Sequence, residues 1–188
     1  MKAVVIYESM YGNTHLIASA IADGLRVHGE ATVVPVAEAR AAVVEGADLV
    51  VVGGPTHAHG LSRAATRRGA VDAARKPGSD LVLDAPEGSD ETGLREWFAS
   101  IGELPKCAAA FDTRVDLPAA LTGRASKGIA RKLRDSGAVL LSKPESFLVT
   151  KDTHLEPQEA ARARAWGEQL GSAISDRVGQ GSASRSGR

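Results

Sequence analysis

The feature that most constrains the fold is an alternation of short apolar runs with segments of helical periodicity. The apolar runs lie at residues 4–6, 32–34, 49–52, 108–111 and 138–141. Continuous apolar runs of this length are typical of parallel strands that are covered on both faces. Between them apolar residues recur at helical spacing, as at Leu16, Ile17, Ala20, Ile21 and Leu25. The alternation predicts a doubly wound α/β fold, in which a five-stranded parallel sheet lies between two layers of helices.

Length and charge limit the domain organisation and the function classes. The 188 residues predict one domain over 1–176, followed by a Gly/Ser-rich tail, 177–188, that we expect to be disordered. Lys and Arg together number 23, as do Asp and Glu, so the chain lacks the positive excess of a nucleic-acid binder. The single Cys107 excludes an internal disulfide. No apolar stretch is long enough to span a membrane, and we expect a cytoplasmic location.

Three stretches depart from the regular alternation. Ser62 is placed to cap a helix that runs to about Lys76. Residues 77–93 are acidic and rich in Gly and Pro, which predicts a long surface loop. Residues 143–146 interrupt the fifth apolar run, and the sequence leaves two readings open there: a bulge, or a hairpin that adds an edge strand.

The loop after the first strand carries the strongest functional signal. Ligands of open α/β sheets bind beyond the carboxyl ends of the strands, and residues 9–14 leave the first strand there and lead directly into a helix. Backbone N–H groups, a glycine at residue 12 and hydroxyls at Ser9 and Thr14 form a pattern that binds anions at a helix N-terminus. Because the loop has no Lys or Arg, it suits one terminal phosphate monoester. The alternative is an ordinary strand–helix turn capped by the two hydroxyls.

Other phosphate-binding motifs are absent from the sequence. No G-x-G-x-x-G follows the first strand, which argues against a dinucleotide fold, and no G-x-x-x-x-G-K-[ST] is present. A phospho-receiver domain would need an acidic residue at the end of the third strand, where this chain has Gly53 and Gly54.

Residues 7–14, Tyr-Glu-Ser-Met-Tyr-Gly-Asn-Thr, resemble the FMN phosphate loop of the flavodoxin-like superfamily, whose pattern is roughly S/T-x-T/S/Y-G-x-T. Gly53–Thr56 and Phe111–Arg114 stand where that superfamily has its two flavin-flanking loops. Together with residues 93–97 and 126–128, these segments are most similar to single-domain flavodoxin-domain proteins of actinobacteria. The resemblance covers roughly residues 3–175.

The resemblance implies the strand order 2-1-3-4-5 and one non-covalently bound FMN. The implied phosphate-binding residues are Ser9, Met10, Tyr11, Gly12, Asn13 and Thr14. The implied ring-binding residues are Pro55, Thr56, His57, Ala58, His59 and Gly60 in the first loop, and Asp112, Thr113 and Arg114 in the second. Within the first loop, Ala58 or Gly60 is the candidate for contact with the flavin N5.

The chain departs from electron-carrier flavodoxins in three respects. Neither loop has a Trp or Tyr to stack on the ring, although His57 or His59 can stack on it or hydrogen-bond to it. The chain is neutral, whereas such carriers are strongly acidic. Arg114 is a cation that would stabilise a reduced flavin anion and raise its potential. A pair of histidines without a third ligand nearby does not indicate a metal site.

Charged residues are clustered even though their total is balanced. The segment 63–76 is basic, and so is the segment 114–134, whereas residues 80–91 are acidic. Solvated helix faces with internal ion pairs are the simplest explanation. The alternative is recruitment of an anionic partner, such as a nicotinamide phosphate or an acidic redox protein, at the mouth of the flavin site.

The sequence therefore predicts an FMN-binding redox protein that exchanges electrons with a partner protein or a small molecule. One alternative is an FMN-dependent oxidoreductase, acting as a quinone or protoporphyrinogen-type dehydrogenase. The other is a binding module of the same fold that has lost the flavin.

Overall fold

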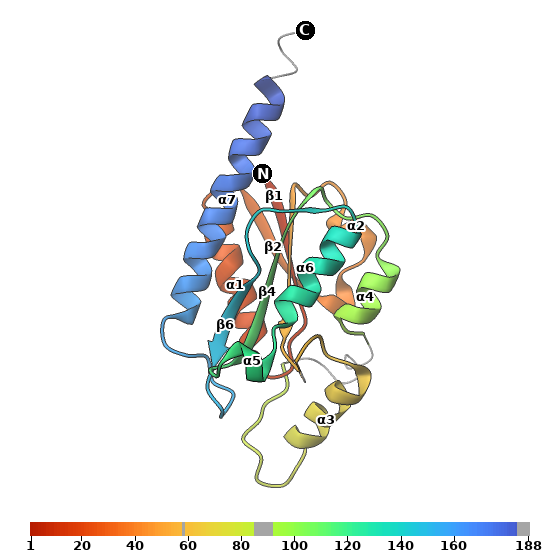
Figure 1. Ribbon diagram of the computed structural model, residues 1–188, viewed down its shortest axis with the longest axis vertical. Coiled ribbons are helices and arrows are strands. Elements are labelled where there is room, and N and C mark those ends of the chain that lie inside the picture. The colour runs from red at the N-terminus through yellow and green to blue at the C-terminus, as the bar shows by residue number, and fades with distance from the viewer. Residues whose placement is uncertain (58, 85–91, 184–188) are drawn as a thin grey trace.

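The computed structural model describes residues 1–57, 59–84 and 92–183, and it consists of a parallel sheet between two layers of helices (Figure 1). The strands are β1 (Lys2–Tyr7), β2 (Glu30–Pro35), β3 (Leu49–Pro55), β4 (Cys107–Val115), β5 (Val139–Leu140) and β6 (Glu145–Val149). They lie in the order β2-β1-β3-β4-β5, and β6 also pairs with β4. The predicted fold class and strand order are confirmed.

The fifth position of the sheet is shared by two short strands. β5 pairs with the start of β4, where Ala108 faces Leu140, and β6 pairs with its second half, where Phe111 faces Glu145. Both pairings are parallel, so the chain leaves the sheet at residues 141–144 and returns to the same edge. Of the two readings that the sequence left open, the interruption is therefore a bulge within one strand position.

One face of the sheet is covered by α1 (Asn13–Leu25) and α7 (Glu159–Ala183). Alternate residues of β1 point to this face, where Val5 packs with Ile17 and Ile21 of α1 and with Leu170 of α7. The two helices approach closely: a Cβ atom at Gly24 would lie 2.1 Å from the carbonyl oxygen of Arg164. This contact fixes α1, and with it the loop that precedes α1.

The opposite face is covered by α6 (Ala125–Asp135), α4 (Leu94–Ser100), α2 (Ala41–Val44) and the 3-10 turn η1 (Val36–Glu38). The other alternate residues of β1, Val4 and Ile6, join this second core, which includes Leu133 of α6 and Trp97 of α4. The indole N–H of Trp97 donates to the carbonyl of Ala39 at 2.6 Å.

Two helices lie at the carboxyl edge of the sheet instead of on its faces. They are α3 (Ala64–Ala74) and α5 (Ala119–Thr122), both at the lower end of the sheet in Figure 1. The prediction that Ser62 caps α3 is wrong. The N-cap is Arg63, whose backbone N–H donates to the Thr66 hydroxyl at 2.8 Å, because the Ser62 hydroxyl binds Glu8 instead.

The last helix continues beyond the predicted domain boundary at residue 176. α7 extends to Ala183 and so includes part of the segment 177–188 that the sequence predicted to be disordered. A helix already nucleated by packed residues gains one hydrogen bond for each residue added, which offsets the weak helix propensity of its glycines. Residues 184–188 lie outside the described residues. Among those described, no helix is both long and apolar enough to cross a bilayer.

Candidate functional site at the carboxyl edge of the sheet

The loop between β1 and α1 has the geometry of an anion-binding turn. Gly12 adopts a left-handed conformation, with φ at 88°, and serves as the N-cap of α1. Its backbone N–H donates to the Ser9 hydroxyl at 3.1 Å. A left-handed residue before a helix turns successive N–H groups toward one side of the loop. The N-terminus of α1 therefore offers backbone donors and a favourable dipole to an anion.

The middle residues of this loop are tied to neighbouring segments. Tyr11 donates its hydroxyl to the Ala70 carbonyl of α3 at 3.1 Å, and Asn13 donates its amide to the Thr153 carbonyl at 2.6 Å. The carbonyl of Met10 accepts from the Asp84 N–H at 2.9 Å. These contacts hold the loop from outside and occupy the Tyr11 and Asn13 side chains, so the groups that the loop has for a ligand are its backbone N–H groups and hydroxyls.

Thr14 connects the first loop with the other two. Its hydroxyl lies 2.7 Å from that of Thr113 at the end of β4, and both side chains are buried. Thr113 in turn accepts a hydrogen bond from the Thr56 N–H through its carbonyl, at 2.8 Å. The structure thus brings together all three segments in which the sequence predicted site residues, and Pro55 lies opposite Thr113 in the sheet.

The segment after β3 forms a tight turn. His57 and Gly60 exchange both backbone hydrogen bonds, at 2.9 and 3.0 Å, and His59 between them has a φ of 71°. The backbone of His59 lies directly against Gly123, where a Cβ atom would be only 2.3 Å from the His59 carbonyl oxygen. Ala58, one of the candidates for N5 contact, lies outside the described residues.

The residues predicted to form the second loop lie inside β4 instead, because the strand extends to Val115 through its pairing with β6, and Asp112 among them is a fully buried carboxylate. Asp112 accepts a hydrogen bond from the Ser126 N–H in the first turn of α6, at 2.7 Å. Burial raises the pKa of Asp112, and the hydrogen bond from the Ser126 N–H partly opposes the increase. The guanidinium of Arg114 is turned onto its own loop, where it donates to the carbonyls of Val115 and Leu117 at 3.3 and 2.6 Å.

Three nitrogen atoms around these loops are buried without a hydrogen-bond partner among the described residues. They are Nε2 of His57, Nε of Arg114 and Nε of Arg124, the last at the N-cap of α6. Burial lowers the pKa of His57, and the charge of Glu8 partly opposes the decrease. A buried polar atom without a partner costs free energy, so these nitrogens suit a ligand that brings hydrogen-bonding atoms to the same place.

An acidic side chain lies against the anion-binding loop. Asp84 Oδ1 is 3.1 Å from Nδ1 of His15 and 3.7 Å from the position that a Cβ atom of Gly12 would take. The His15 ring stacks on Tyr7 at a centroid distance of 4.5 Å. Burial, together with the charges of Asp84 and Glu38, raises the pKa of Tyr7 to about 12. Asp84 opposes the binding of an anion at this loop by charge repulsion.

Sequence reasoning missed a buried polar network directly beside the loop. Glu8 accepts hydrogen bonds from the Ser62 hydroxyl and, at 2.8 Å, from the Leu94 N–H. Arg67 of α3, which is 1% exposed, donates to Ser62 at 3.2 Å and pairs with Glu96 at 3.2 Å. The only sequence signal was a charged residue immediately after a buried strand, since nothing in the spacing connects Glu8 with Arg67.

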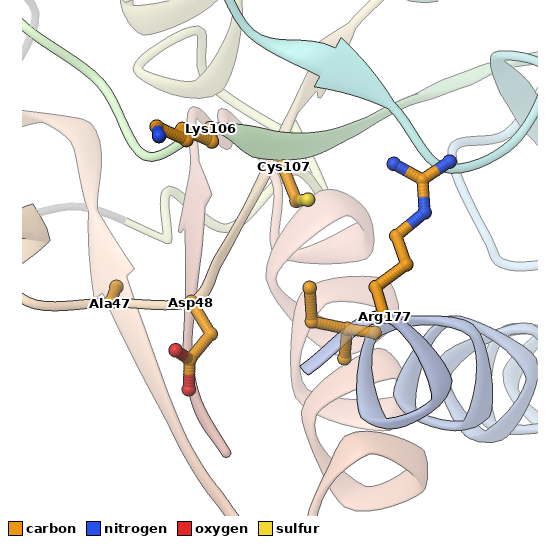
Figure 2. Close-up of a pocket in the computed structure, with 6 residues that line it drawn as sticks. Ala47, Asp48, Lys106, Cys107 and Arg177 are labelled. Carbon is orange, nitrogen blue, oxygen red and sulfur yellow. The ribbon is translucent and has the colours of Figure 1, made fainter. Parts of the chain in front are cut away.

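A hollow lies at the opposite end of the strands from these loops (Figure 2). It is a cavity of about 320 Å³ lined by Ala47, Asp48, Lys106, Cys107, Ile174 and Arg177. Its lining residues lie just before β3, just before or at the start of β4, or in α7, so it is remote from the three loops. Among the described residues, no three His, Cys, Asp or Glu side chains form a group that could hold a metal ion.

Comparison with known proteins agrees with this architecture. The model of the flavodoxin family matches residues 5–81. A search of curated proteins found no match. An archaeal flavodoxin superposes with a TM-score of 0.63 at 19% identity, over 93% of this chain and 99% of the other. Oxidised flavodoxin 1 from Bacillus cereus gives 0.60 at 22% identity, over 94% and 98%. The flavodiiron core of Synechocystis gives 0.59 at 19% identity, over 94% and 36%.

The chain has the flavodoxin fold. The matched segment 5–81 includes the end of β1, the loop at residues 9–14 and the turn after β3. The flavodoxin fold thus explains why loops that are distant in sequence meet at one edge: β1, β3 and β4 are neighbouring parallel strands, so their carboxyl ends lie together.

Proposed function

We propose that the protein binds one FMN without a covalent bond and exchanges electrons with a redox partner. The observation that supports this most directly is the meeting of the three predicted segments at Thr14, Thr56 and Thr113, together with three buried nitrogens that have no hydrogen-bond partner among the described residues. The flavodoxin fold and the match to the flavodoxin family model support the same cofactor. We further propose that the protein is most similar to single-domain flavodoxin-domain proteins of actinobacteria and that it is located in the cytoplasm.

The residues present fit such a cofactor at both of its ends. The loop from Ser9 to Thr14 would hold the phosphate through backbone N–H groups and the α1 dipole. The unpartnered nitrogens of His57, Arg114 and Arg124 would serve the polar edge of the ring. Bound FMN supplies the redox chemistry, whereas the protein sets the potential through hydrogen bonds and nearby charge.

The polar side chains at the ring end have distinct roles in this proposal. His57 would hydrogen-bond the ring through Nε2, the nitrogen that the structure leaves without a partner. The positive charge of Arg114 would favour an anionic reduced ring and so raise the potential. Thr56 and Thr113 would hold the two flanking loops in register through their backbone hydrogen bond.

A second candidate function is that of a flavin-free binding module. Two observations favour it: the Asp84 carboxylate lies against the phosphate loop, and the His59 backbone lies against Gly123. An enzymatic variant of the main proposal is an FMN-dependent quinone or protoporphyrinogen-type dehydrogenase, with its substrate beside residues 114–124.

An absorbance spectrum with and without added FMN tests the proposal. Flavin bands shifted from those of free FMN are expected, and Gly12→Val should weaken FMN binding about 100-fold, because valine disfavours the left-handed backbone of the loop. Gly69→Val, at an open position on α3, is the matched control and should bind FMN like the wild type.

The outcomes separate the three functions. A protein that remains colourless and does not quench FMN fluorescence would contradict the proposal and favour the flavin-free module. If Gly12→Val binds FMN as tightly as the wild type, the phosphate-loop assignment is wrong. Rapid bleaching of the flavin by NADH or NADPH, or turnover with a quinone, would identify an enzyme, whereas exchange only with a protein partner would identify a carrier.

A further inference from the structure

Four cations form a single stripe along α6. Arg124, Lys127, Arg131 and Arg134 are spaced by three, four and three residues, which places them on one face of a helix. Lys127, Arg131 and Arg134 are exposed, while the opposite face of the helix buries Ile129 and Leu133. Figure 1 shows α6 along the outer side of the sheet, with one end at the carboxyl edge.

The stripe has no acidic partner within the described part of the chain. None of the ion pairs there includes one of the four cations. On the other face of the sheet, by contrast, Arg162 pairs with both Glu145 and Glu159. Internal pairing, the simplest explanation for the basic segment from the sequence, therefore does not account for these cations.

The stripe does not stabilise its own helix. Like charges three or four residues apart repel each other along a helix surface. Arg124 and Lys127 also lie at the N-cap and in the first turn, where the helix dipole disfavours positive charge. Of the four, only Arg134 lies in the last turn, where the dipole favours it. A binding partner would explain a cost that no ion pair among the described residues offsets.

The stripe begins at the candidate site. The first turn of α6 is held by the Thr56 hydroxyl, which accepts from the Ala125 N–H at 2.9 Å, and by Asp112, which accepts from the Ser126 N–H. Both residues belong to the loops proposed to flank the flavin ring. From there the ten residues to Arg134 span about 15 Å along the helix axis. This length suits a macromolecular surface better than a single small anion.

We propose that the stripe on α6 is the docking surface for an acidic electron-transfer protein, which would bind across α6 and reach the ring edge at Arg124. This rests on the proposed redox function. Complementary charge would accelerate the encounter and orient the partner. A protein is favoured over a nucleic acid because the stripe starts at the redox site and the chain as a whole carries no net charge.

Titration calorimetry with an acidic plant-type [2Fe–2S] ferredoxin tests the proposal, at an ionic strength of about 20 mM, where the Debye length is roughly 20 Å. The triple variant Lys127→Glu/Arg131→Glu/Arg134→Glu should bind at least about 30-fold more weakly than the wild type. The control Arg68→Glu/Lys76→Glu/Lys151→Glu makes the same change in charge at exposed positions elsewhere, and it should change affinity less than about threefold.

Binding is measured with and without FMN, so a failure of the FMN proposal is seen separately from a failure of docking. The docking proposal is overturned if the ferredoxin does not bind, or if both triple variants weaken its binding equally. It is also overturned if basic cytochrome c or a short DNA duplex binds the wild type more tightly than the ferredoxin does. A loss of affinity confined to the α6 variant supports it.

Discussion

At the scale of single residues, Asp84 is the side chain that fits an anion site least. Its carboxylate is placed against the loop by its own backbone N–H, which bonds Met10, and by its contact with His15. A negative charge close to a bound phosphate costs on the order of 1 kcal/mol at a partly exposed position. Asp84 therefore limits affinity for a phosphate monoester instead of contributing to it.

We expect Asp84→Asn to tighten FMN binding about fivefold, because asparagine keeps an oxygen that can accept from His15 but removes the charge. The gain should shrink as salt is added. Fluorescence titration measures both. Asp80→Asn, which removes the same charge from an exposed position in the same segment, should leave affinity within about twofold. Equal or weaker binding by Asp84→Asn would show that the carboxylate does not face the ligand.

At the scale of elements, Asp112 couples β4 to α6. The buried carboxylate accepts from the Ser126 N–H, and burial holds its pKa above the usual range. Because the pKa is higher in the folded state, Asp112 contributes stability at low pH. That contribution is lost as the pH rises through the folded pKa and the carboxyl must ionise while buried.

Asp112→Asn should remove this pH dependence while keeping an acceptor for Ser126. The free energy of unfolding of the variant, relative to the wild type, should therefore increase as the pH is raised from about 3 to 7. Urea unfolding across that range measures the difference. Asp116→Asn, an exposed carboxylate just beyond β4, is the control and should give a nearly constant difference. If the free energy of unfolding of Asp112→Asn, relative to the wild type, does not change with pH, the pKa of Asp112 is not raised by folding.

The elements also show what sequence patterns can and cannot predict. Strands β1, β3 and β4 were predictable because their apolar runs are buried on both faces, and the phosphate loop because its residues are consecutive. The position of α3 was not predictable from the sequence, because an amphipathic pattern shows that one side of a helix is buried but does not specify which part of the protein covers it. The contact of Asp84 with His15 and that of Glu8 with Ser62 depend on tertiary packing between segments 54 or more residues apart, where no periodicity applies.

At the scale of the whole molecule, α3 is attached to the body by polar contacts and covers neither sheet face. Arg67 reaches Ser62 and Glu96, and Tyr11 of the phosphate loop holds the Ala70 carbonyl. Gly93 leaves space for this arrangement, because a Cβ atom there would be 2.2 Å from the Arg67 guanidinium. The carboxyl edge is therefore expected to open more readily than the apolar core between α1 and α7.

Arg67→Met should weaken the attachment of α3 at the carboxyl edge more than it weakens the apolar core between α1 and α7. Methionine fills similar space but leaves Glu96 without its cation and Ser62 without its donor, and losing one member of a buried charged network costs about 3 kcal/mol. We expect a lower urea midpoint and faster amide exchange in α3, with exchange in α1 and α7 changed only through global unfolding. Arg68→Met, exposed on the same helix, should change the free energy of unfolding by less than about 0.5 kcal/mol. If Arg67→Met leaves both the midpoint and the α3 exchange unchanged, α3 is held by its apolar contacts, and the buried network does not position the edge that carries the site.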